Sequence, residues 1–208
     1  MEKVAEALIG VCYLWWHEGM PMDTGAGPFW SANADLPPLE RIQAEGCCCS
    51  GLLNLLRRAD GATVAGVEDG NPYAGGVPAW ADFFRHAGTL LPLTAEELPM
   101  LEDWTLLIRP YKDEEDQGHI AFIRKGGIYH CRPDKLDLSE RQGLQSPGVI
   151  QDGPEAIQWA IESGYYTQKV LPSAWRSAQK VGTPTFTSSS EPPPAMDARA
   201  ATPEPLLP

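Results

Sequence analysis

The spacing of apolar residues predicts mainly helices in the first half of the chain. Apolar side chains recur three and four positions apart over residues 2–16, which is typical of an amphipathic helix. A dense run of leucines over residues 49–59 predicts a buried helix. Shorter helices are expected over residues 40–44 and 78–86, and loops rich in glycine and proline separate these segments.

Short apolar runs between turn-forming residues predict strands in the second half, over residues 104–109, 118–124, 127–132 and 164–171. If Lys125 and Gly126 form a two-residue turn, the two middle strands make a tight hairpin. His130 then becomes a diagonal neighbour of His119 on the same face, roughly 7 Å away. A turn one residue later keeps both histidines on one face but moves them further apart.

The length and composition suit one globular domain followed by a tail. The chain has 208 residues, of which 43% are hydrophobic and 21% charged, so it can bury a sizeable core. Residues 177–208 are dominated by serine, threonine, proline and alanine, and they offer too little apolar surface to offset the entropy lost on ordering. We therefore expect a folded domain over residues 1–176 and a disordered tail over residues 177–208.

The charge and the N-terminus limit the partners and the location. A net charge of −12 repels a phosphate backbone, so no nucleic acid partner is expected. No apolar run approaches the roughly 18 residues that a membrane span needs, so no membrane span is expected. The acidic N-terminus does not resemble a signal peptide. We expect a monomer, located in the cytoplasm by default.

Three of the five cysteines are consecutive, and the third stands where a loop enters the leucine-rich helix. Adjacent cysteines do not easily bridge one another, so a disulfide framework is not expected and a reducing compartment is the simpler inference. Consecutive cysteines also cannot all point at one tetrahedral ion, so no metal site is expected. A thiol at a helix start feels the positive end of the helix dipole, which predicts a lowered pKa for Cys49.

A thiol, a base and an orienting group in this chain order are typical of a cysteine hydrolase. We assign Cys49 as the candidate nucleophile, His119 as the general base and His130 as the group that orients the base. This chemistry needs no cofactor. The simpler alternatives are that Cys49 is a small buried apolar residue and that His119 is a core histidine with satisfied hydrogen bonds.

Three further residues are candidates for substrate binding. Trp30 and Tyr73 lie in glycine-rich loops, where an aromatic side chain can line a substrate groove. Ser50 follows the candidate nucleophile directly.

These motifs resemble the signature of the NlpC/P60 family of papain-like cysteine peptidases. The family places its nucleophile in a Cys-Ser-Gly-Leu element, its base in a Gly-His-Ile strand and a third polar residue about one hairpin later. The corresponding residues here are Cys49-Ser50-Gly51-Leu52, Gly118-His119-Ile120 and His130. One departure is Cys48, which stands where the family usually has an aspartate.

Over about residues 20–176 the chain is also similar to a divergent branch of this family found in large DNA viruses and some microbes. The shared motifs cover residues 27–30, 49–58, 75–80, 117–121, 164–167 and 172–175. They are more specific than an isolated cysteine and histidine.

The resemblance implies an α+β, papain-like core, in which the helix that carries the cysteine packs on an antiparallel sheet that carries the histidines. It also implies hydrolysis of an amide bond in a peptide or peptidoglycan fragment, typically the bond that follows D-glutamate at its γ-carboxyl. Two alternatives stay open. The same core could act as an acyltransferase to a lipid or amine, or it could be a catalytically idle domain that binds peptide or protein.

Overall fold

The computed structural model describes residues 1–14, 29–113, 116–132 and 148–176. The predicted disordered tail over residues 177–208 lies outside the described residues, as does part of the loop that precedes Trp30. The described helices are α1 (Glu2–Leu8), α2 (Leu39–Glu45), α3 (Cys49–Ala59), α4 (Val77–His86), α6 (Pro154–Ser163), α7 (Pro172–Arg176) and the 3-10 helix η1 (Ala95–Met100). The described strands are β1 (Leu91–Pro92), β2 (Leu106–Arg109), β3 (His119–Arg124), β4 (Gly127–Arg132), β5 (Gly148–Asp152) and β6 (Gln168–Val170).

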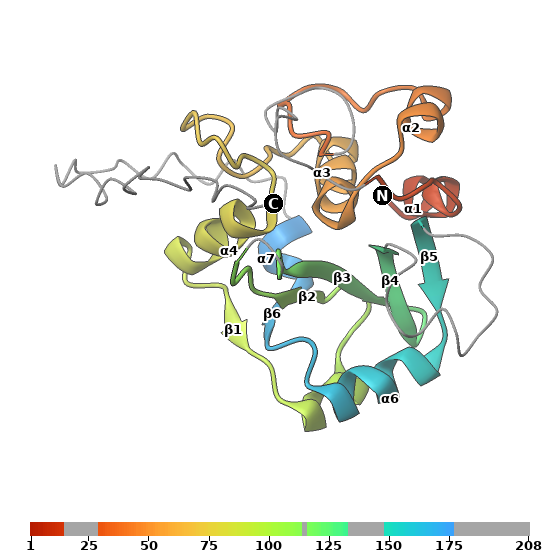
Figure 1. Ribbon diagram of the computed structural model, residues 1–208, viewed down its shortest axis with the longest axis vertical. Coiled ribbons are helices and arrows are strands. Elements are labelled where there is room, and N and C mark those ends of the chain that lie inside the picture. The colour runs from red at the N-terminus through yellow and green to blue at the C-terminus, as the bar shows by residue number, and fades with distance from the viewer. Residues whose placement is uncertain (15–28, 114–115, 133–147, 177–208) are drawn as a thin grey trace, which may run out of the picture.

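All described strands belong to one sheet in the order β1-β6-β2-β3-β4-β5, and every neighbouring pair is antiparallel. The sheet separates two groups of helices. Helices α1, α2 and α3 lie on one side, and α6 with η1 lies on the other (Figure 1). Helices combined with an antiparallel sheet confirm the α+β class.

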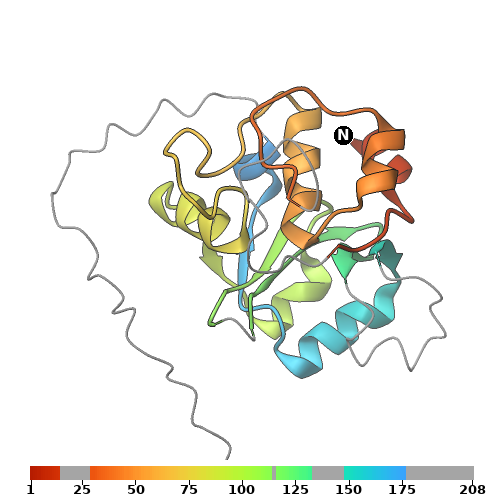
Figure 2. The ribbon, with the colours of Figure 1, turned by 45° about the horizontal axis from the view of Figure 1, so that its top comes forward.

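Side chains of β3 alternate between the two cores, as the geometry of a strand requires. Ile120 and Phe122 pack into the core that contains the leucines of α3. Ala121 and Ile123 pack into the second core, which contains the apolar residues of α6. Figure 2 shows α3 with its N-terminal end directed at the sheet.

The β3–β4 hairpin has the tight turn that the sequence predicts. Lys125 and Gly126 have φ angles of 51° and 72°, and a two-residue hairpin turn with both φ values positive matches the twist of the strands. The register therefore places Ala121 directly opposite His130.

A buried amide is among the side chains that attach helix α3 to its neighbours. The Asn54 side chain donates to the carbonyl oxygens of Phe29 at 2.7 Å and Gly75 at 3.0 Å. It also accepts a hydrogen bond from the Trp80 indole at 2.7 Å. One side chain thus joins the cysteine helix to two loops and to α4, which restricts where the start of α3 can lie.

The first helix is shorter than its sequence pattern predicts. Helix α1 ends at Leu8, and Gly10 follows with a left-handed φ of 89°. Cys12 then forms an isolated bridge with Gly148 at the start of β5. The apolar pattern beyond Leu8 therefore reflects burial of Val11 beside the sheet, and the predicted helix over residues 2–16 is wrong over residues 9–14, while its last two residues lie outside the described residues.

The sequence patterns also missed β1, η1, β5, α6 and α7. Two predicted strands are shorter in the structure. The strand expected from residue 104 begins at Leu106, because Trp104 has a left-handed φ of 71°. The strand expected over residues 164–171 forms only at Gln168–Val170.

Candidate active site

Cys49 is the first residue of α3, as predicted, and Cys48 is its N-cap. The Cys48 sulfur accepts a hydrogen bond from the Gly51 N–H at 3.3 Å. A side-chain oxygen usually has this capping role, so the sulfur replaces it. Cys49 consequently lies in the first turn, where backbone N–H groups have no partner within the helix.

The Cys49 sulfur lies near the backbone of β3. The ladder between β3 and β4 runs from the Ala121–His130 pair to the turn. Outside that ladder, the backbone N–H of Ile120 and the N–H of the next helical residue lie near the Cys49 sulfur, and both lower the pKa of its thiol. The candidate nucleophile is thus held against the backbone of the strand that begins at His119.

Burial raises the pKa of the Cys49 thiol to about 11, although the two N–H donors and the Arg109 guanidinium lower it. Cys49 is only 8% exposed. The predicted lowering of this pKa is therefore wrong. The free-energy cost of removing a thiolate from water is larger than the stabilisation that the helix N-terminus gives it. The resting group is the neutral thiol.

The two candidate histidines form a hydrogen-bonded pair. Nε2 of His119 lies 3.2 Å from Nδ1 of His130, and the ring centroids are 5.4 Å apart. Each residue is 4% exposed. The contact follows from the hairpin register, which makes them diagonal neighbours across Ala121, as the sequence predicts for a two-residue turn.

Asp152 extends this pair to a row of three side chains, and the sequence patterns missed it. Its Oδ2 lies 3.0 Å from Nε2 of His130. Asp152 is the last residue of β5, two positions beyond Ile150, which pairs with His130, so the two polar side chains share a face. The signal that could have found it is an acidic residue directly before a Gly-Pro helix start.

Asp152 fixes the protonation pattern of the row. A carboxylate only accepts hydrogen bonds, so Nε2 of His130 carries a proton. Nδ1 of the neutral His130 ring is then an acceptor, and Nε2 of His119 must donate to it. Nδ1 of His119 then carries the lone pair of that ring and is the basic atom of the row. The described contacts include no hydrogen bond between this ring and the Cys49 sulfur.

Both histidines are neutral near pH 7. Burial lowers the pKa of His119 well below its ordinary value, and the charges of Arg109 and Arg132 contribute in the same direction. Burial also lowers the pKa of His130, although its hydrogen bond to Asp152 opposes this shift. Neutral rings agree with the tautomers that the hydrogen bonds require.

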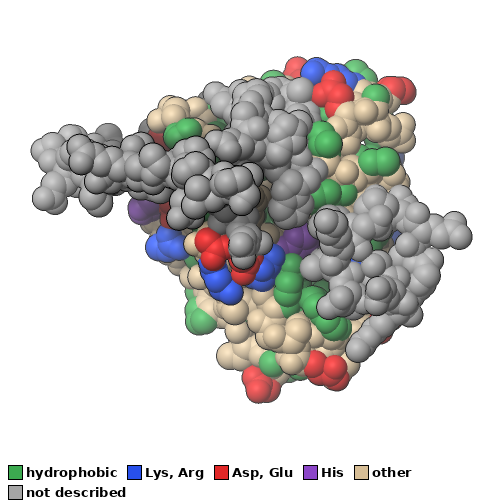
Figure 3. Space-filling view, viewed as in Figure 1, with side chains coloured by type: hydrophobic (Ala, Val, Ile, Leu, Met, Phe, Trp, Pro, Cys, Tyr) green, Lys and Arg blue, Asp and Glu red, His purple; other side chains and the backbone are tan. Residues whose placement is uncertain are grey.

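Arg109, Tyr165 and Tyr166 lie next to the histidines, and the sequence patterns did not indicate a role for them at the site. Arg109 lies opposite His119 in the β2–β3 register and forms an ion pair with Asp116. Its guanidinium lies 4.4 Å from the ring centroid of Tyr165. The rings of Tyr165 and Tyr166 lie 6.1 and 6.2 Å from the His119 ring. Figure 3 shows histidine atoms at the surface in the middle of the view, beside basic and acidic side chains.

The three predicted substrate-binding residues differ in their exposure to solvent. Trp30 is fully buried and donates from its indole to the Gly46 carbonyl at 2.8 Å, so it supports the loop before the cysteines and the prediction of a substrate-facing ring is wrong. Ser50 is 1% exposed, and its hydroxyl contacts the Cys48 sulfur at 3.4 Å. Tyr73 is 55% exposed, and its role in substrate binding stays a prediction.

Within the described residues, no group of three or more histidine, cysteine, aspartate or glutamate side chains is placed to hold a metal ion. None of the described helices has the length and apolar character that crossing a membrane requires. Comparison of the chain with protein-family models, curated proteins and solved structures gives no match. The fold and the site define an α+β protein with a buried thiol at the start of α3 and an Asp-His-His row that begins on β3, the strand whose backbone lies near this thiol.

Proposed function

We propose that this protein is a cysteine hydrolase with a papain-like core of the NlpC/P60 kind, and that it cleaves an amide bond in cell-wall-type peptides. The observation that carries the proposal is the hydrogen-bonded row from Asp152 through His130 to His119. This row leaves one basic nitrogen on β3, the strand whose backbone N–H at Ile120 lies near the Cys49 sulfur. The resemblance of the sequence motifs supports the substrate class.

In the proposed reaction, Nδ1 of His119 takes the proton of the Cys49 thiol while the sulfur attacks the amide carbonyl carbon. The carbonyl becomes an oxyanion, to which the Cys49 backbone N–H in the first turn of α3 donates. One such donor is worth about 3 kcal/mol. His119 then protonates the leaving amine as the carbon–nitrogen bond breaks, and afterwards it activates the water that hydrolyses the thioester.

The reaction starts from a neutral thiol and a neutral imidazole. Burial raises the pKa of Cys49 to about 11 and lowers that of His119, so a resting thiolate–imidazolium pair is disfavoured. Substrate binding must bring the sulfur and Nδ1 within hydrogen-bond distance, as often happens only in the substrate complex. Alkylation of the free protein by iodoacetamide near pH 6 should therefore be slow at Cys49.

The low exposure of the site favours a second candidate function, acyl transfer. Cys49 and His119 are 8% and 4% exposed, so a thioester formed there meets little water. A bound amine or lipid could then accept the acyl group in place of water. Product analysis with an added amine or phospholipid separates transfer from hydrolysis.

The proposal is tested with wild-type protein and Cys49→Ala on a panel of muropeptides and lipids, with products identified by mass spectrometry. We expect Cys49→Ala to lose at least about 10⁴-fold in turnover and to keep its circular dichroism spectrum. Cys12→Ala, which removes an exposed cysteine, is the matched control and should keep full activity. Equal turnover by Cys49→Ala would remove the assignment. If the wild-type protein binds peptides but forms neither a product nor an acyl adduct, the protein is a peptide-binding domain and the proposed hydrolysis is refuted.

A further inference from the structure

Two cysteines that the proposed reaction does not use touch each other behind the site. The Sγ atoms of Cys47 and Cys131 lie 3.5 Å apart, and the Cys131 thiol also donates to the Cys47 carbonyl at 3.2 Å. Both residues are fully buried. They are 84 positions apart in the sequence, so only the fold brings these thiols together.

The backbone around each thiol is fixed by the sheet and its extension. The Cys47 N–H donates to the Cys12 carbonyl at 3.0 Å, and the Leu14 N–H donates to the Cys47 carbonyl at 2.9 Å. Cys131 lies inside β4 and pairs with Val149 of β5. The two sulfurs therefore stay close, and a disulfide of about 2.05 Å needs them to approach by roughly 1.5 Å.

We propose that Cys47 and Cys131 are a site of reversible oxidation, where a two-electron oxidant such as a peroxide or an azo compound produces an intramolecular disulfide. Each thiol loses its proton, one sulfur–sulfur bond forms, and the pair gives up two electrons. Hydrogen peroxide takes these electrons and protons to become two waters, and an azo compound becomes a hydrazine. Excess small-molecule thiol reverses the reaction by exchange.

The disulfide would constrain the backbone next to the candidate active site without using any of its three candidate catalytic residues. Cys47 precedes Cys49 by two residues, and Cys131 follows His130 directly. A bond between them would tie the loop of the candidate nucleophile to the strand of the candidate orienting histidine, and it would leave the Cys49 thiol free. Oxidation is thus expected to stabilise the fold, because it closes a long loop of the unfolded chain. The proposal goes beyond the proposed function and does not depend on it.

Burial sets the rate of this oxidation. It raises the pKa of the Cys131 thiol well above its usual range, and the contact with Cys47 contributes to the shift. Since the thiolate is the reacting form, the pair should oxidise more slowly than the exposed Cys12, and faster at higher pH or in mild urea.

The test uses the full chain in a Cys12→Ser background, which removes the exposed cysteine that could join two molecules. The protein is treated with diamide, an azo oxidant, then denatured, alkylated and digested with trypsin. We expect the intact mass to fall by two hydrogens and the peptide of the cysteine triplet to be joined to the peptide of Cys131. Fragment ions must place the bond at Cys47. Four alkylated cysteines after exhaustive treatment, or a bond at Cys48 or Cys49, would overturn the proposal.

Matched variants give a second readout that needs no substrate. Cys48→Ser and Cys49→Ser should keep the cross-link, whereas Cys47→Ser and Cys131→Ser should lose it. The oxidised protein should also melt about 5–10 °C higher than the reduced protein. A cross-link that survives in Cys47→Ser, or an oxidised protein that melts no higher, contradicts the proposal. The wild-type peptide map decides the case if a serine variant does not fold.

Discussion

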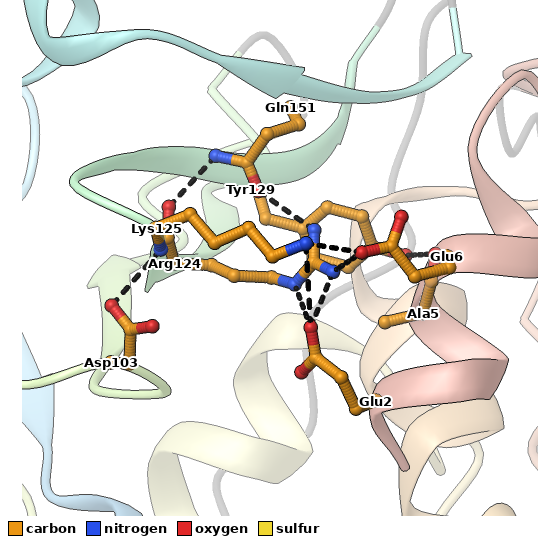
Figure 4. A network of polar contacts seen from close by, with 8 residues as sticks. All are labelled: Glu2, Ala5, Glu6, Asp103, Arg124, Lys125, Tyr129 and Gln151. Atoms are coloured by element: carbon orange, nitrogen blue, oxygen red, sulfur yellow. Dashed lines mark hydrogen bonds and ion pairs between the residues drawn. The ribbon is translucent and has the colours of Figure 1, made fainter.

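Strand β3 begins at the row of Asp152, His130 and His119 and ends at a charged cluster around Arg124, and these two polar clusters lie on opposite faces of the sheet. At its end, the Arg124 guanidinium forms ion pairs with Glu2 and Glu6 of α1 (Figure 4). The rings of Trp104 and Tyr129 lie 5.6 and 5.2 Å from it. This cluster attaches the N-terminal helix to the sheet.

The two clusters differ in how far their acidic partners reach into water. The Arg124 side chain is 1% exposed, but those of Glu2 and Glu6 are 51% and 47% exposed. Burial lowers the pKa of Arg124, yet the hydrogen bonds to both glutamates outweigh this and raise it. The side chain of Asp152 is only 5% exposed, and its hydrogen-bond partner His130 stays neutral. Asp152 also pairs with Arg132, whose side chain is 4% exposed, so both charges of this ion pair are removed from water, whereas the counter-charges of Arg124 keep contact with water.

The largest effect on this comparison is expected from Asp152→Asn, which removes the acceptor-only group at the end of the row. An amide can also donate, so it can leave the His130 proton on the wrong nitrogen. We expect kcat to fall about 100-fold, equal to about 2.7 kcal/mol, and the melting temperature to fall as well, because the buried Arg132 loses its acidic partner. Steady-state kinetics on any substrate that the wild type cleaves measures the first effect, and a thermal melt measures the second. An unchanged kcat would mean that the row does not act as a unit.

A smaller effect is expected from Arg124→Met, which keeps most of the side-chain volume but removes the charge. Loss of the ring contacts and of two half-exposed ion pairs should lower the free energy of unfolding by about 2 kcal/mol. Lys125→Met is the matched control, since Lys125 also pairs with Glu6 but its side chain is 54% exposed. Its cost should be under about 0.5 kcal/mol. Equal losses in urea unfolding at pH 7 would show that burial does not distinguish the two cations.

The two clusters should reduce the free energy of unfolding at different pH values when the solution is acidified. The pKa of His119 is lowered by burial, so below about pH 6.5 the unfolded chain binds more protons than the folded chain. Stability is therefore complete above that pH and falls below it by up to about 1.4 kcal/mol per pH unit for each histidine.

At the other cluster, hydrogen bonds from Lys125 and Arg124 lower the pKa of Glu6, so its loss begins only below about pH 4.5. Urea unfolding at a series of pH values measures both steps. His119→Gln should flatten the upper step and Glu6→Gln the lower one. Identical pH curves for the two variants would refute the separation.

Local signals made the hairpin and the cysteine helix predictable from the sequence. The leucine run after Cys49 defined the helix, since its bounds depend mainly on an apolar pattern and a cap. The residues Lys125 and Gly126 defined the turn, and the turn alone fixed the contact between His119 and His130.

The remaining features depend on contacts between distant segments. The pKa of Cys49 follows from burial by the assembled fold, which outweighs the helix end that the sequence reveals. Asp152 enters the row only because β5 pairs with β4, and residues 148–152 hold few of the apolar residues that mark a strand. Trp30 stands in a glycine-rich loop that suggested exposure, but its indole caps the Gly46 carbonyl inside the core.

The length of the two-residue turn between β3 and β4 also determines which face of the sheet each side chain of β4 points to. One residue added to or removed from it would exchange the faces of that strand, so His130 would point toward α3 and Tyr129 toward α6. The contact between His119 and His130 and the contact between Arg124 and the Tyr129 ring would then be lost together, although no polar side chain had been replaced. We therefore expect the length of this turn to constrain the protein as strictly as the identity of any residue in its site.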